Sequence, residues 1–290
     1  MFGAVFGGAL FTLYAPGAAA LLRMRRTLIA ATLGALLVAG VMLAVQTALM
    51  SGTPGDAADP ELLEAVLTGT GAGRALAARG ALISAALAAL VVLPFRSRLT
   101  LGFVTALSGG ALASMAWSGH GAAGGGVVHL TVVVLHLLAA GAWIGALVPF
   151  GRFALRARGS LSEGEAAHMA DALERFAGVG SVIVAVLILT GVLNTWFLAR
   201  PDVVGVLFSE LWGRLLLLKL VLFGGMLAIA ALNRFSLTPA VRRGVTDEEI
   251  SRVAFRRLRS SVVVETLLAF GVLALVAWLG TLSPQGDMMM

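Results

Sequence analysis

The side chains best suited to chemistry in this chain are His129, His136 and Trp143, which are spaced by seven positions. Seven residues make about two turns of an α-helix, so all three side chains share one helix face. The two imidazole rings then lie about 10 Å apart along the helix axis. They cannot ligate a single ion at metal–nitrogen distances of about 2 Å. They can instead act as successive metal stations, each completed by ligands from elsewhere.

Further candidate ligands precede this stretch in the chain. They are His120 in a glycine-rich loop, Met42 and Met50 in one apolar segment, and Met115 in another. Imidazole and thioether groups without carboxylate or thiolate favour copper over magnesium, calcium or manganese. A structural role is the alternative, because a membrane histidine can simply bond a neighbouring helix and methionine fills gaps in apolar cores. We favour plain packing for Met42 and Met115, and Met50 at a helix end is the better ligand candidate.

Lys219 and Asn194 are polar side chains within apolar stretches, where such groups are costly and usually functional. Lys219 needs a partner, a neutral state or a wet cavity. Asn194 and Gln46 could solvate it. Because a cation at this depth would repel copper, an anion-binding or gating role for Lys219 is as plausible as a role in ligation.

Glu265 and Asn233 are the other two polar candidates. Glu265 lies one turn inside the last apolar segment, with Arg256, Arg257 and Arg259 close by in the chain. We expect an ordinary ion pair there. Asn233 opens the tripeptide Asn-Arg-Phe at the end of another apolar segment, which we expect it to anchor.

The elements that carry these residues are membrane spans. Of the 290 residues, 59% are hydrophobic and 12% are charged, with a mean hydropathy of +0.97, whereas a soluble domain carries roughly 25% charged residues. Apolar runs close to about 20 residues long predict bilayer-spanning helices. Eight such segments stand out: Phe2–Leu22, Thr27–Met50, Ala75–Pro94, Leu99–Trp117, Val127–Phe150, Gly178–Leu198, Leu211–Leu232 and Val262–Leu282.

We therefore predict an all-α, polytopic helical membrane bundle with about eight spans, forming one membrane domain over residues 1–290. Residues 1–74 hold two spans and a surface helix that Asp59 caps and Pro60 begins. Residues 75–284 hold the remaining spans, and residues 285–290 form a tail. We also expect charged amphipathic helices over residues 160–175 and 246–259.

Arginine placement predicts the orientation of the bundle. Alternate loops carry most arginines, whereas the opposite loops carry only Arg74, Arg79, Arg200 and Arg214. Basic loops stay in the cytoplasm, so both termini should face outward. The candidate ligands then gather in the outer half of the bundle. Because the basic residues lie in short loops between spans, they do not indicate nucleic-acid binding.

The chain contains no cysteine, which excludes disulfides, thiolate metal sites, iron–sulfur clusters and cysteine nucleophiles. It also has no phosphate-binding loop, nucleophile motif or HExxH helix. The residues therefore give no support to an enzyme.

Several stretches resemble the CopD/PcoD copper-resistance family of inner-membrane proteins. They are residues 118–120, 136–145, 175–176 with 190–194, 212–219 with 233–235, and 259–265 with 279–281, in a similar region over about residues 75–284. The resemblance implies eight helices, copper movement across the bacterial inner membrane, usually uptake from the periplasm, and a small periplasmic CopC-like copper carrier as partner. The family's motif positions fall on His120, His136, Trp143, Lys219, Asn233 and Glu265.

The resulting hypothesis is a copper transporter, for Cu⁺ or Cu²⁺, in which the ion enters through His120 and His129 and then reaches His136. One alternative is a membrane protein that holds copper for a partner without flux. Another is a b-type haem electron-transfer protein. A haem held by two histidines needs them on opposing helices, whereas His129 and His136 share one helix face.

Overall fold

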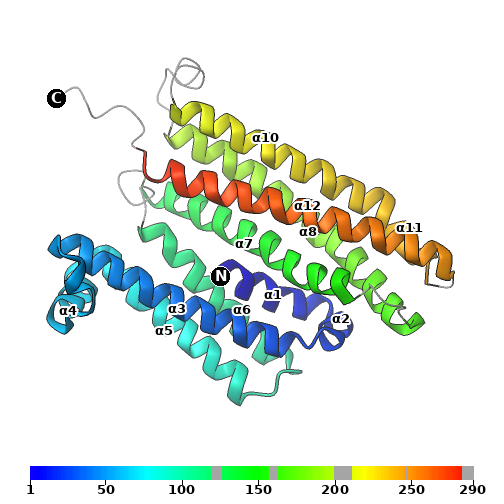
Figure 1. Ribbon diagram of the computed structural model, residues 1–290, viewed down its shortest axis with the longest axis horizontal. Helices are drawn as coiled ribbons and strands as arrows, with labels where there is room; N and C mark the ends of the chain where they lie inside the picture. Colours follow the sequence, from blue (N-terminus) through cyan, green and yellow to red (C-terminus); the bar gives the residue numbers. More distant parts are fainter. Residues whose placement is uncertain (119–125, 157–161, 199–210, 246, 283–290) are drawn as a thin grey trace. The chain divides into compact units, whose positions relative to one another are not determined.

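The computed structural model describes residues 1–118, 126–156, 162–198, 211–245 and 247–282, which form helices and turns without a strand (Figure 1). Seven of the described helices are long and apolar enough to cross a membrane. They are α3 (Met24–Ser51), α5 (Gly71–Val92), α6 (Arg98–Ala113) with η2 (Ser114–Ser118), α7 (Gly126–Arg156), α8 (Glu163–Leu198), α10 (Leu211–Leu232) and α12 (Glu248–Leu279). The predicted all-α polytopic membrane bundle is confirmed, while the count of eight spans and the outward termini stay predictions.

The first apolar segment is not the continuous span that we expected over residues 2–22. It consists of α1 (Phe2–Tyr14) and α2 (Pro16–Leu21), separated at Ala15, whose φ and ψ are −128° and 59°. Proline has no N–H to donate and disfavours a helical conformation in the residue before it. The 13 residues of α1 fall short of the about 20 that a perpendicular span needs.

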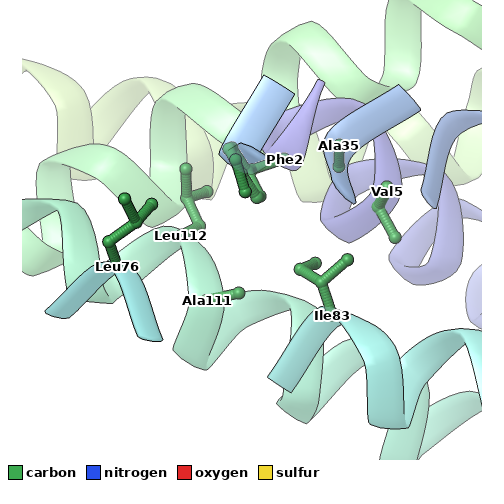
Figure 2. Packing of buried hydrophobic residues seen from close by; sticks show 8 residues of the cluster. Phe2, Val5, Ala35, Leu76, Ile83, Ala111 and Leu112 are labelled. Atoms are coloured by element: carbon green, nitrogen blue, oxygen red, sulfur yellow. The ribbon is translucent and has the colours of Figure 1, made fainter. Parts of the chain in front are cut away.

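The chain packs into two compact units, Met1–Pro149 and Phe150–Met290. In the first unit, α1 packs against α3 and α6, and α5 packs against α3 and α6. Each of these four helices contributes two residues to one buried apolar cluster, part of which is labelled in Figure 2. We call this set the apolar cluster: Phe2, Val5, Ala35, Ala39, Leu76, Ile83, Ala111 and Leu112.

Glycines bring α1 and the middle of α7 into backbone contact. Gly3 and Gly7 on α1 meet Gly141 and Gly145 on α7, with a spacing of four residues on each helix. A Cβ atom added to Gly7 would lie 2.5 Å from the Gly141 carbonyl oxygen and 2.7 Å from the Gly145 Cα. Small residues at this spacing allow such close crossings in membranes, and here the crossing fixes α7 against α1.

Between α3 and α5 lie η1 (Pro54–Ala58) and α4 (Pro60–Gly69). The Asp59 carboxylate accepts hydrogen bonds from the backbone N–H groups of Glu61 (3.0 Å) and Leu62 (3.1 Å). Pro60 occupies the first helical position, where no N–H donor is needed. The predicted capped helix is confirmed.

In the second unit, α10 packs against α12, and the short α11 (Thr238–Arg243) packs against α8 and α12 (Figure 1). The helix expected over residues 160–175 is the continuous beginning of α8 and not a separate element. At 36 residues, α8 is about 54 Å long, well beyond the about 30 Å of hydrocarbon. Its first turns therefore extend outside the membrane, where Glu165 pairs with Arg156 at 2.8 Å.

Candidate functional site

The predicted histidine face lies on α7. His129, His136 and Trp143 all belong to this helix, so the seven-residue spacing does place them on one side of it. His129 is 5% exposed, Trp143 is buried, and His136 is half-buried. An imidazole this deeply buried in an apolar helix is costly to keep without a role.

The glycine contact with α1 uses the opposite side of α7. Helical periodicity places Gly141 and Gly145 about 140° and 180° around the axis from His136. The contact that holds α7 in the first unit therefore leaves the histidine face directed away from α1. Among the described residues, no group of three or more histidine, aspartate or glutamate side chains forms a metal site.

The methionine candidates separate into two kinds. Met42 and Met115 are half-buried and pack against the apolar cluster, as Leu137 and Leu138 of α7 also do. Both methionines pack as we favoured, and copper ligation by either of them stays a prediction. Met50 lies in the last turn of α3 and is 63% exposed. His120 lies outside the described residues, so its predicted role as an entry ligand stays a prediction.

Arg79 is the functional candidate that the sequence interpretation missed. It was counted with the outer loops, but it lies inside α5 and is 1% exposed. Its Nε–H donates to the Ser114 hydroxyl at 3.1 Å, and its guanidinium lies 5.7 Å from the centre of the Phe2 ring. Ser114 precedes Met115, so the arginine ties α5 to the turn that carries this methionine. The available signal was a cation placed inside a predicted span.

In the second unit, Asn233 and Glu265 lie in one buried polar cluster. Asn233 begins the π-helical turn η4 (Asn233–Leu237), a rare element that often marks functional sites. Its side-chain N–H donates to the Glu265 carboxylate at 3.2 Å, and its side-chain carbonyl oxygen accepts a hydrogen bond from the Ser261 hydroxyl. Glu265 is 4% exposed. The structure therefore gives this carboxylate an amide partner, and the expected pairing with nearby arginines stays a prediction.

Lys219 and Asn194 do not form the expected pair. The Asn194 side-chain carbonyl oxygen is buried and accepts no hydrogen bond from the described residues, Lys219 included, so the predicted solvation of Lys219 by Asn194 is wrong. Lys219 is half-buried and has neither a hydrogen bond nor an ion pair within the described part of the chain. Gln46, its other expected partner, belongs to the first unit, and its solvation of Lys219 stays a prediction. Polar residue types in the same half of a membrane did not suffice to predict their contact.

Comparison with known proteins gives matches along both units. The model described as "Copper resistance protein D-like, N-terminal domain" matches residues 1–130, and the model "Copper resistance protein D" matches residues 170–279. Copper resistance protein D of Pseudomonas syringae pv. tomato is 39% identical, over 97% of this chain and 92% of its own length. Inner membrane protein YebZ of Escherichia coli K12 is 31% identical, over 88% of this chain and 83% of its own.

The similarity thus also includes the first two apolar segments, beyond the region that the motifs had indicated. No solved structure matches the chain. Together with the apolar helices, these relatives identify a multi-pass protein of the inner membrane. The chain belongs to the copper resistance protein D family.

Proposed function

We propose that this protein transports copper across the inner membrane, taking it up from the periplasm through histidine stations on α7. The observation that supports this proposal is the pair His129 and His136, one buried and one half-buried, two turns apart on a single helix face. Imidazole nitrogen is a good copper ligand, and two stations in series allow an ion to move stepwise. The membership in a copper-resistance family agrees with this chemistry.

In the proposed route, His120 receives copper at the outer side, His129 binds it next, and His136 holds it deeper in the membrane. A periplasmic CopC-like carrier would supply the ion to His120. Met50 is exposed at the end of α3 and is the thioether that can join the first binding step, whereas Met42 and Met115 serve packing. Trp143 follows His136 by two turns on the same face of α7. In this route it forms the inner end of the histidine face.

The test uses histidine variants with a histidine control. His136→Ala and His129→Ala should each reduce copper accumulation in proteoliposomes to the level of empty vesicles, because each removes one station. His168→Ala is the matched control, because His168 is exposed near the beginning of α8 and lies outside the route. Copper content per purified chain should fall in the first two variants and stay unchanged in the third.

Unchanged accumulation in His136→Ala would overturn the route. Normal copper content in the wild-type chain without any flux into vesicles would identify a copper-holding or assembly protein instead. A Soret absorption band in the purified chain would favour the haem alternative. These three measurements therefore separate transport, storage and electron transfer.

A further inference from the structure

A pocket of about 500 Å³ lies in the second unit, where η4 and α11 meet α8. It is built at the end of the apolar helix α10, immediately after Leu232. The lining includes three arginines and one carboxylate: Arg234, Arg242, Arg243 and Glu174. The remaining wall includes the apolar groups of Ala177, Phe235 and Pro239. This pocket is separate from the histidine face, and nothing in the proposed copper route uses it.

The arginines of the pocket differ in how their charge is balanced. Arg242 is paired with two carboxylates, Asp171 at 2.7 Å and Glu174 at 2.5 Å, which balance its charge and leave one negative charge over. Arg234 instead donates to the Ala177 carbonyl oxygen at 2.9 Å and to the Ser181 hydroxyl. Arg243 donates to the carbonyl oxygen of Pro239 at 3.4 Å. Within the described residues, neither Arg234 nor Arg243 has a carboxylate partner.

Three arginines and two carboxylates leave a net charge of +1 here, and the guanidinium groups of Arg234 and Arg243, which have no carboxylate partner within the described residues, can bind an anion. Each guanidinium carries five N–H donors in a planar fork that fits phosphate oxygens. The bonds that Arg234 and Arg243 make to neutral groups leave several of these donors unused. The chemistry of the pocket therefore fits a phosphate group.

The apolar surroundings decide which phosphate compound fits. The Phe235 ring lines the pocket and is 75% exposed. Leu232, the last residue of α10, is also exposed. These side chains continue the lipid-facing surface of a membrane span up to the two arginines. A soluble phosphate would leave this surface unused, whereas a phospholipid would cover it with its acyl chains.

We propose that this pocket binds the headgroup of an anionic phospholipid, with its phosphodiester between Arg234 and Arg243 and its acyl chains against Phe235 and Leu232. The pocket lies on the arginine-rich side of the bundle, which we predict to be cytoplasmic. Basic pockets at this depth bind anionic headgroups in other membrane proteins. The π-turn η4 contributes to both the buried polar cluster and the pocket. Asn233 bonds Glu265 inside the unit, while Arg234 and Phe235 line the pocket.

The test measures binding of phosphatidylglycerol to the full-length chain in a neutral detergent. Native mass spectrometry should show retained phosphatidylglycerol, and its addition should raise the unfolding temperature more than the same amount of phosphatidylcholine. Arg243→Gln should weaken phosphatidylglycerol binding at least about tenfold, or about 1.4 kcal/mol, because a hydrogen bond to a charged group contributes no less than this. Arg234→Gln/Arg243→Gln should remove the preference over phosphatidylcholine.

Arg257→Gln is the matched control, because Arg257 is exposed in the same unit and does not line the pocket. It should bind phosphatidylglycerol as the wild-type chain does. Arg243→Gln keeps the proposal testable even if loss of Arg234 destabilises α8. Wild-type affinity in Arg243→Gln, or equal binding of phosphatidylcholine, would overturn the proposal. A thermal shift of the same size with glycerol 3-phosphate would also overturn it, because the acyl chains would then contribute nothing.

Discussion

At the scale of single residues, the buried carboxylate of Glu265 depends on a short chain of donors. Ser261 donates to Asn233, and Asn233 donates to Glu265, so each member satisfies the next. A buried carboxylate without such bonds is very costly in hydrocarbon. The asparagine amide can serve both neighbours at once because it carries a donor and an acceptor on one side chain. The cluster therefore joins η4 to α12 through polar contacts in an otherwise apolar unit.

Replacing Ser261 with alanine should show how much these hydrogen bonds contribute to the stability of the fold. Ser261→Ala leaves the part-buried side-chain carbonyl oxygen of Asn233 without its donor, and the loss of such a hydrogen bond costs about 1 kcal/mol. The unfolding temperature in detergent should fall accordingly. Ser260→Ala is the control, because the neighbouring hydroxyl is exposed and bonds only its own helix at Arg256 among the described residues. Equal unfolding temperatures for the two variants would contradict the assigned role of the cluster.

The residues themselves were largely identifiable from the sequence, but their contacts were not. His129 and His136 followed from spacing alone, because a helix fixes which of its own residues share a face. Asn233 and Glu265 were each singled out as polar groups in apolar surroundings, yet their bond depends on a π-turn that no pattern indicated. Arg79 was missed because its charge was assigned to a loop. Asn194 and Lys219 were paired wrongly, because depth in the membrane does not fix the rotation of two helices.

At the scale of elements, the contact between α1 and α7 should be sensitive to side-chain size. Gly7→Ala would place a Cβ 2.5 Å from the Gly141 carbonyl oxygen, so the helices must separate. Overpacking of this kind costs about 1–3 kcal/mol, and the unfolding temperature should fall. Gly40→Ala is the control, because a Cβ there meets nothing within 4 Å. A chain that tolerates both substitutions equally would show that the crossing is not a close backbone contact.

Element boundaries followed from local chemistry where one residue determines them. Asp59 and Pro60 predicted the beginning of α4, because capping depends only on neighbouring residues. Pro16 divides the first apolar segment for an equally local reason, but apolar length alone had suggested a single span. The glycine pairs of α1 and α7 could not be matched in advance, because each pair is meaningful only beside its partner helix. Local signals thus predicted the elements, and packing had to come from the structure.

At the scale of the whole molecule, α7 is the element that both compact units share. The boundary between the units falls between Pro149 and Phe150, inside this helix. The two family models match on either side of it and leave most of α7 between them. The helix that carries both proposed histidine stations, His129 and His136, therefore also connects the two units along the chain. Its orientation in the membrane decides from which side a metal ion reaches His129 before His136.

That orientation can be tested directly, because the chain has no cysteine of its own. Thr53→Cys, just after α3, should react with a membrane-impermeant maleimide in intact spheroplasts, because we predict this end of the bundle to face the periplasm. Ser162→Cys, just before α8, should react only after the membrane is opened. Both positions are exposed, so accessibility of the side chain does not differ between them.

The reverse labelling pattern would place the Thr53 end in the cytoplasm. Arginine distribution would then have failed as a guide to topology for this chain. Because α7 begins on the same side of the bundle as the end of α3 in the predicted topology, His129 would be the inner station and His136 would be reached from outside first. The labelling result therefore determines which of the two stations a periplasmic ion reaches first, and the vesicle assay measures the direction of flux.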